Sequence, residues 1–280
     1  MSVKHKEITV VAMDFKNHQL TKRAVELTLE RIQPKEVLII SDQQFCTEGT
    51  FIKAAAPSSF VDYAWMMMKW IGPLIDTGHA LYIQYDGMPW DAENWDDDFL
   101  NYDYIGAVWP WEPEGQNVGN GGFSLRSKKF LDACRDSAIT MTESRQQAED
   151  ASLCIDHRPY LEQFHNIKFA PTAVAHRFSH EVEKVGHTWG FHGQWNLFAN
   201  LDMKNLEYYM EHLNFRGWNI YLWHHVLVAM ANRGLQSHLE TVIPILLDDQ
   251  PDLAPNLVNW FLSENFQNRD WVVLKLLKQI

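Results

Sequence analysis

The chain has 280 residues, of which 46% are hydrophobic, and 36 acidic against 24 basic residues give it a formal net charge of −12. This length buries a sizeable core in one large or two small domains, and the many aromatic residues exclude a disordered chain. The acidic surplus argues against a protein that wraps nucleic acid by charge neutralisation, and three scattered cysteines are too few for a disulfide framework or a zinc ribbon.

No targeting or membrane-spanning segment is evident in the sequence. No run approaches eighteen consecutive apolar residues, and the apolar run that ends at Asp14 is too brief for a signal-peptide core. We therefore expect a cytoplasmic protein whose cysteines, Cys46, Cys134 and Cys154, are reduced structural thiols.

Strands and helices alternate in the first third of the chain. Residues 8–13, 37–40 and 80–84 are short apolar runs, typical of buried strands. Between them, residues 20–32 and 60–71 have apolar side chains spaced for one face of a helix. This order predicts a parallel α/β sheet with right-handed crossovers.

A carboxylate follows each of these three strands. Asp14, Asp42 and Asp86 stand at or near the predicted strand ends, and Gly87 follows Asp86. Because ligands bind beyond the carboxyl ends of the strands in such sheets, the three acids predict a polar cleft there.

The rest of the chain divides into a loop-rich part and a helical part. Strands are expected at 104–109 and 121–125, and a helix at 127–138, within a region that extends to about residue 196. From about residue 197 only helical periodicity remains, for example over 205–213, 218–232, 237–247 and 256–262. We expect a domain of residues 1–196 and a helical region 197–280 packed on it.

The negative charge is concentrated in one segment. Residues 70–125 contain ten acidic residues and no Lys or Arg, so the remaining chain, with 26 acidic and 24 basic residues, is nearly neutral. For 91–98 the simplest interpretation is a solvated acidic loop. Asp86 differs because it ends an apolar strand before a glycine, where a carboxylate can hold Mg²⁺ or Mn²⁺ against a diphosphate.

A glycine-rich segment lies between two predicted strands. Gly119, Gly121 and Gly122 surround Asn120, where the backbone turns sharply or lies close to a ligand. It is not a phosphate-binding P-loop, because the Gly-Lys-Ser/Thr ending is missing. A plain turn before a strand is equally compatible with this composition.

An acidic pair and a group of histidines complete the candidates. Glu149 and Asp150 stand at a predicted helix start, where they either complement the helix dipole or present a general base. Six histidines fall between His157 and His192, and His176 and His180 have the i, i+4 spacing of half a zinc site. The zinc-protease pattern is absent, and His192 lies in a small-residue loop that could place an imidazole on a bound ion.

Several motifs in one order resemble a known family. They are Gln84-Tyr85-Asp86-Gly87, residues 102–107, the run 118–127 with Asn-Gly-Gly-Phe-Ser-Leu-Arg-Ser, Glu149-Asp150, and Phe191-His192-Gly193. Over residues 8–196 the chain is similar to the domain of unknown function 5672, whose bacterial and viral members look like GT-A glycosyltransferases. The resemblance implies a GT-A-like, Rossmann-like mixed sheet flanked by helices.

The resemblance also implies a nucleotide-binding half of about residues 1–110, an acceptor half of about 111–196, and roles for individual residues. Asp14, Asp42, Asp86 and Gly87 would bind a nucleotide-sugar donor, and Asp86 with His192 would hold Mn²⁺ or Mg²⁺. Asp150 or Glu149 would deprotonate an acceptor hydroxyl. The sugar and acceptor site would be lined by Asn120, Gly121, Gly122, Phe123, Trp109 and Trp189. The sequence departs from the Asp-X-Asp metal motif, since Gln84-Tyr85-Asp86 has one carboxylate, so a metal-free or inactive member stays open.

The sequence therefore predicts a glycosyltransferase that moves a hexosyl or pentosyl group from a nucleotide diphosphate to a hydroxyl of a glycan, with inversion or retention. A modified nucleobase is an alternative acceptor, for which Arg126, Lys128 and Lys129 form the one basic strip available. Two other classes stay open: a non-catalytic carbohydrate-binding or scaffold protein on this fold, and a metal-dependent hydrolase that uses the histidines of 157–192.

Overall fold

The computed structural model describes residues 3–141 and 148–278, which form two compact units. The first unit comprises Met1–His192 and the second Gly193–Ile280. The boundary predicted between residues 196 and 197 falls inside helix α7 (Gln194–Asn200). The unit boundary instead lies at the glycine that precedes this helix.

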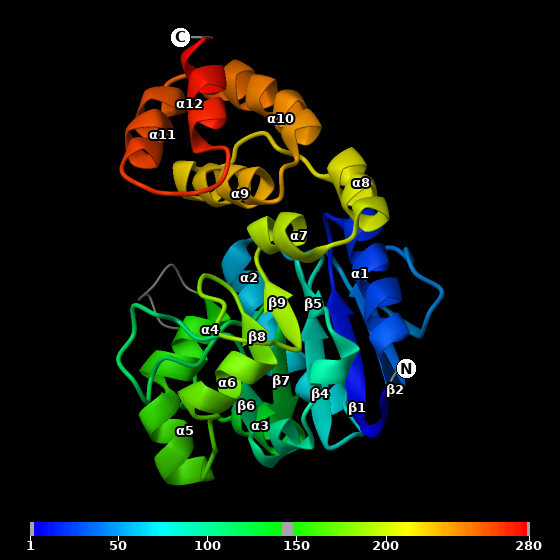
Figure 1. The fold of residues 1–280 in the computed structure, drawn as a ribbon. Helices are drawn as coiled ribbons and strands as arrows, with labels where there is room; N and C mark the ends of the chain where they lie inside the picture. The colour runs from blue at the N-terminus through cyan, green and yellow to red at the C-terminus, as the bar shows by residue number, and fades with distance from the viewer. Residues whose placement is uncertain (1–2, 142–147, 279–280) are drawn as a thin grey trace. The chain divides into compact units, whose positions relative to one another are not determined.

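A six-stranded mixed sheet forms the centre of the first unit (Figure 1). Its order is β3-β2-β1-β4-β7-β6. The strands are β1 (Val3–Met13), β2 (Ile32–Ser41), β3 (Thr50–Lys53), β4 (His79–Ile83), β6 (Tyr104–Ile105) and β7 (Ser124–Ser127). The first four strands of this order are parallel, whereas β7 runs antiparallel to both of its neighbours. The predicted mixed α/β sheet flanked by helices is confirmed.

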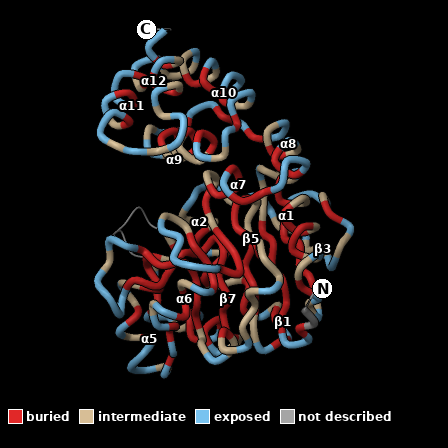
Figure 2. The backbone as a smooth tube through the Cα atoms, viewed as in Figure 1, coloured by how far each residue is buried: buried red, intermediate tan, exposed pale blue. Residues whose placement is uncertain are grey.

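The β-branched run of β1 explains why both faces of the sheet are covered. Val10 pairs with Val37 of β2 and Leu81 of β4, so β1 is central. Alternate side chains of a strand point to opposite faces, and Val10 and Val11 accordingly belong to different core clusters. Figure 2 shows the central strands buried and the outer surfaces of the surrounding helices exposed.

Each face has its own helices. On one face, α1 (His18–Arg31) contributes Val25 to the core cluster that contains Val10. On the other, Met67 and Phe130 pack in the cluster that contains Val11. Met67 lies in a π-helical turn (Met66–Trp70) that continues α2 (Phe60–Trp65), and Phe130 lies in α3 (Lys128–Ala133).

Some predicted elements have other bounds. The helix expected over 60–71 is α-helical only to Trp65, and the one expected over 127–138 ends at Ala133. Only Tyr104–Ile105 of the strand expected over 104–109 pairs in the sheet, because Gly106 then brings the chain against the backbone of Gly119.

A three-stranded sheet beside the main one was not predicted. It has the order β5-β9-β8, from β5 (Gly87–Pro89), β8 (Ser179–His180) and β9 (Gly190–His192). Strands of two or three residues show no period in sequence, so only tertiary pairing reveals them. This sheet places Gly87 directly opposite His192.

Short helices and turns connect these strands. They are the 3₁₀ helices Gly72–Leu74, Ala92–Asn94 and Asp97–Asn101, then α4 (Glu149–Ala151) with its π-helical continuation Ser152–Asp156, α5 (Arg158–His165) and α6 (Thr172–Phe178). All three cysteines are buried and form no disulfide.

Helices are the only regular secondary structure among the described residues of the second unit. After α7 it contains α8 (Met203–His212), α9 (Ile220–Asn232), α10 (Gln236–Asp249), α11 (Leu253–Leu262) and α12 (Arg269–Leu277). The predicted helical character of this region is confirmed, and α12 is a helix beyond the four segments named from the sequence. None of the helices within 3–141 and 148–278 combines the length and the apolarity that crossing a membrane requires.

The close approach at Gly106 gives a test of the fold. A Cβ at this position would lie 1.9 Å from the carbonyl oxygen of Gly119, and backbone cannot yield as a flexible side chain can. We expect Gly106→Ala to lower the free energy of unfolding by about 1–3 kcal/mol in urea denaturation. The control is Gly78→Ala, whose Cβ would find its nearest neighbour at 3.6 Å; equal losses in both variants would contradict the expectation.

Candidate active site

The first predicted donor-binding acid, Asp14, accepts hydrogen bonds from residues that follow it closely in the chain. Its Oδ1 accepts hydrogen bonds from the backbone N–H groups of Lys16 (2.8 Å) and Asn17 (2.6 Å). Its Oδ2 accepts one from the Thr21 hydroxyl at 2.8 Å. Asp14 thus closes the turn between β1 and α1, although it also lines a cavity.

The second acid, Asp42, lies apart from that cavity. Its side chain is 43% exposed, and its Oδ1 lies 3.4 Å from Nε2 of His18 and 3.2 Å from the Ser41 hydroxyl. His18 is held in turn by Gln43, whose amide lies 2.6 Å from Nδ1. Of the strand-end acids that the sequence grouped together, Asp14 lines the cavity described below, whereas Asp42 is not part of its lining.

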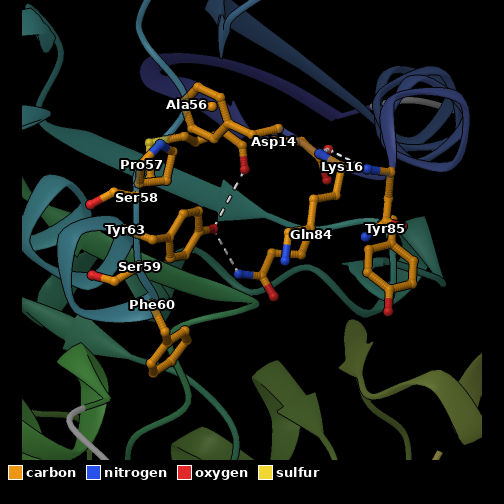
Figure 3. A pocket seen from close by; sticks show the side chains of 13 residues that line it. Asp14, Lys16, Ala56, Pro57, Ser58, Ser59, Phe60, Tyr63, Gln84 and Tyr85 are labelled. Atoms are coloured by element: carbon orange, nitrogen blue, oxygen red, sulfur yellow. Dashed lines mark hydrogen bonds between the residues drawn. The ribbon is translucent and has the colours of Figure 1, made fainter. Parts of the chain in front are cut away.

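A cavity of about 430 Å³ opens at the carboxyl ends of β1 and β4. Three segments line it: 13–17, 56–60 with Tyr63, and Gln84 with Tyr85. Figure 3 shows the Tyr63 hydroxyl between Gln84, whose amide donates to it at 3.1 Å, and the Met13 carbonyl, to which it donates at 3.4 Å. The lining combines aromatic rings with the exposed cation Lys16 and stops one residue before Asp86.

Asp86 and His192 face each other next to this cavity. Both are largely buried, and Asp86 Oδ1 lies 3.8 Å from His192 Nε2. Oδ1 accepts no hydrogen bond from the described residues. The Nδ1 of His192 lies 3.1 Å from Glu181 Oε1 and 2.9 Å from the amide nitrogen of Asn120.

Burial and charge shift the pKa values of this pair. Burial raises the pKa of Asp86, an effect that the nearby His192 partly offsets. Burial alone would lower the pKa of His192, but the carboxylates of Asp86 and Glu181 outweigh it and raise this pKa to about 9. The two carboxylates therefore favour the protonated form of His192 as long as no cation takes the place of its Nε2 proton.

The glycine-rich segment is a tight turn to which these groups attach. Asn120 has φ +68°, and its Oδ1 accepts from the N–H groups of Gly122 (3.2 Å) and Phe123 (3.3 Å). A Cβ on Gly122 would lie 2.0 Å from His192 Nε2, and one on Gly87 would lie 2.8 Å from the Gly122 carbonyl. The absence of side chains lets two backbone segments and one imidazole meet here.

The acidic pair Glu149 and Asp150 lies on the other side of the same turn, and its two carboxylates have different partners. Glu149 forms a buried ion pair with Arg126, with Oε1 2.8 Å from Nη2. Asp150 is only partly buried by its accessible surface, and its Oδ2 accepts from the Gly121 N–H at 2.7 Å. Burial and the charge of Glu149 raise the pKa of Asp150 to about 6. Glu149 is thus held in an ion pair, whereas Asp150 forms none with the residues of 3–141 and 148–278.

The aromatic residues expected at the sugar site lie in the core instead. Phe123 and Trp189 are 0% and 1% exposed, and both pack against Phe178. Trp109 is 7% exposed, and its ring lies where a Cβ on Gly119 would be. These rings offer no open face for a sugar, because burying their large apolar area is more favourable than exposing it.

The histidines of 157–192 have separate partners. His157 bonds to Thr140, His165 to Asp136 and His180 to Thr188, while His176 lies in α6. Nowhere in 3–141 or 148–278 do three or more His, Cys, Asp or Glu residues gather in a way that could hold a metal ion. This separation gives no support to a zinc hydrolase.

The proposed basic strip does not form either. Arg126 is fully buried, Lys128 pairs with Asp132, and Lys129 pairs with Asp103 at 3.0 Å. The acidic loop 91–98 is a set of local caps: Asp91 and Asp96 accept backbone N–H groups, and Arg177 bridges Asp96 and Asp98.

Sequence reasoning missed three contributors to the site. Glu181 and Arg126 act through contacts with residues 11 and 23 positions away, and no local pattern marks such pairs. Tyr63 lines the cavity from a helix whose apolar spacing predicted only packing. The one available signal was Arg126 itself, a charged residue in the short strand Ser124–Ser127.

The segment that carries most of this site matches a known protein family. Residues 53–192, half of the chain, match the family described as "Protein of unknown function (DUF5672)". The chain belongs to this family. No curated protein matches the sequence.

Three solved structures of glycosyltransferases are distantly similar to this chain. One is involved in the glycosylation of the major capsid of PBCV-1, with 13% identity and a TM-score of 0.43 over 74% of this chain and 99% of that one. The galactosyltransferase LgtC, in complex with donor and acceptor sugar analogs, is 11% identical and has a TM-score of 0.42 over 71% of this chain and 93% of its own. The apo form of the glycosyltransferase GlyE of Streptococcus pneumoniae is 11% identical and has a TM-score of 0.44 over 75% of this chain and 61% of its own. Likenesses of this size assign no activity.

The strand-end acids Asp14 and Asp42 give a test of the site's architecture. Asp14→Ala removes acceptors for two backbone N–H groups and one hydroxyl, so we expect it to lower the free energy of unfolding by about 1–2 kcal/mol. Asp42→Ala removes an exposed carboxylate and should change the free energy of unfolding by less than about 0.5 kcal/mol. Urea denaturation measures both; a larger loss in Asp42→Ala would contradict the assignment.

Proposed function

We propose that this protein is a glycosyltransferase that moves a sugar from a nucleotide diphosphate to a hydroxyl group of an acceptor, a glycan in the first instance. One observation carries the proposal: the turn Asn120–Gly122 contacts Asp150 through one backbone N–H and His192 through Asn120. A candidate base and a candidate diphosphate site are thus fixed to the same three residues, as one displacement at a sugar carbon requires.

The cavity at the ends of β1 and β4 suits the nucleotide part of the donor. Its 430 Å³ lies within the usual range for small-ligand pockets. Phe60 is 58% exposed at its edge and offers a ring face for a base. Lys16 supplies a positive charge, and the lining leads along the chain from Tyr85 directly to Asp86.

Asp86 and His192 fit a divalent cation. Their facing atoms are 3.8 Å apart, too far for a charge-assisted hydrogen bond, and Asp86 Oδ1 is buried without one. Glu181 on Nδ1 resembles the outer carboxylates that orient metal-binding histidines. Mn²⁺ or Mg²⁺ held there, with oxygens of the donor completing its shell, would neutralise the charge of the leaving diphosphate.

Asp150 supplies the base in this proposal. Its carboxylate takes the proton of the acceptor hydroxyl while the acceptor oxygen bonds to the anomeric carbon and the carbon–oxygen bond to the diphosphate breaks. Glu149, tied to Arg126, offers no second carboxylate for a covalent intermediate, which favours inversion at the sugar carbon.

The function and its metal are tested together with a panel of nucleotide sugars. We expect one of them, with Mn²⁺, to raise the thermal midpoint and to release nucleotide when an acceptor is present. Asp86→Asn should lose the metal-dependent part of both signals, whereas the control Asp42→Asn should keep it. A full Mn²⁺-dependent shift in Asp86→Asn would refute the metal assignment, and a panel without any response would refute the function.

The base is tested by pH and substitution. A carboxylate with a pKa of about 6 must lose its proton to act, so kcat/KM should fall as pH drops through about 6. Asp150→Asn should lower turnover by about 10²–10⁴-fold and retain nucleotide binding in calorimetry. Wild-type turnover in this variant, or an unchanged acid limb, would show that another group takes the proton.

A further inference from the structure

Arg126 is the most deeply buried charge next to the candidate base. It is 0% exposed, and its guanidinium lies 4.1 Å from the centre of the Tyr82 ring and 5.4 Å from that of Tyr104. A buried charge of this kind is tolerated only where it is paired and hydrogen-bonded. Its Nε donates to the Ser124 hydroxyl at 3.0 Å.

The remaining contacts of Arg126 lead to the turn and to the acidic pair. Its Nη2 lies 2.8 Å from Glu149 Oε1 and donates to the carbonyl of Gly121 at 3.3 Å. The N–H of the same glycine donates to Asp150. Gly121 is therefore held through its carbonyl by Arg126 and through its N–H by Asp150.

Glu149 fits beneath the turn only because residue 121 has no side chain. A Cβ on Gly121 would lie 2.1 Å from Glu149 Oε1 and 3.1 Å from Arg126 Nη2. The carboxylate is thus enclosed between the turn and the guanidinium, with its charge compensated there. Asp150, next in the chain, has no cation within ion-pair distance among the described residues.

We propose that Arg126 is a positioning residue: by binding Glu149 and the Gly121 carbonyl, it withdraws Glu149 from chemistry and reserves the role of base for Asp150. This inference rests on the proposed function for its catalytic meaning. The arrangement itself does not depend on a substrate, so it can be tested without one.

The test follows the ionisation of Asp150 by carbon-detected NMR on the full chain. The groups that act on Asp150 electrostatically are Glu149 of α4, Arg126 of β7, Tyr104 of β6, Cys154 after α4, and His192 of β9. Among them, Glu149 and Arg126 oppose each other. Removing one charge of the pair should therefore move the titration of Asp150 in one direction, and removing the other in the opposite direction.

Two variants use this opposition. Glu149→Gln removes a neighbouring negative charge and keeps an oxygen for Arg126, so the midpoint of Asp150 should fall by about one unit. Arg126→Met leaves the charge of Glu149 uncompensated, so the midpoint should rise. The control Glu240→Gln, which breaks an ion pair with Lys275 in the second unit, should leave it in place. The proposal is overturned if the titration midpoint of Asp150 stays unchanged in Glu149→Gln, or if it moves in the same direction in both site variants. If Arg126→Met does not fold, the result for Glu149→Gln alone decides.

Turnover adds a readout that separates this inference from the proposed function. With an active nucleotide sugar, the acid limb of kcat/KM in Glu149→Gln should shift to lower pH together with the NMR midpoint. Loss of turnover at every pH in this variant would make Glu149 the base and overturn the inference. If the wild type transfers no sugar, the proposed function fails, while the NMR midpoints still decide whether Arg126 controls Asp150.

Discussion

The buried ion pair between Arg126 and Glu149 is the contact on which the arrangement of this site depends. It joins β7 of the main sheet to α4, and through the Gly121 carbonyl it also holds the turn between β6 and β7. Taking both charges out of water is costly, and breaking one partner of such a pair typically costs about 3–5 kcal/mol. The flanking tyrosine rings and the Ser124 hydroxyl offset part of that cost.

Around this contact, glycines let backbone segments approach one another and neighbouring side chains closely. Gly87, Gly106, Gly121 and Gly122 each stand where a Cβ would lie within 3 Å of a neighbouring group. Their lack of a side chain lets β5, β9 and the turn meet, and it places His192 opposite Asp86. The local acidity of residues 70–125 has a mixed explanation: Asp86 belongs to this site, while Asp91 and Asp96 cap short helices.

The sequence predicted much of the sheet and some of the site. The apolar run of β4 was located to within one residue, and the ends of β1 and β2 likewise, since buried parallel strands have continuous apolar sequences. The starts of β1 and β2 were each missed by five residues, because both strands begin with mostly polar residues that carry no such pattern. Grouping Asp14, Asp42 and Asp86 as one donor site was less successful. Asp14 closes a turn and Asp42 is exposed, and strand-end position alone cannot distinguish a carboxylate that binds its own backbone from one that faces a ligand.

By itself, the sequence determined the α/β class, the helical second unit and the short motifs that mark the family, because these depend on periodicity and local composition. Only the tertiary structure decided that Glu149 is held in an ion pair with Arg126, and that Phe123 and Trp189 are core residues. It also revealed Glu181 behind His192. These outcomes depend on ion pairs and ring contacts between segments distant in the chain, and the residues involved carry no local pattern that announces their partners.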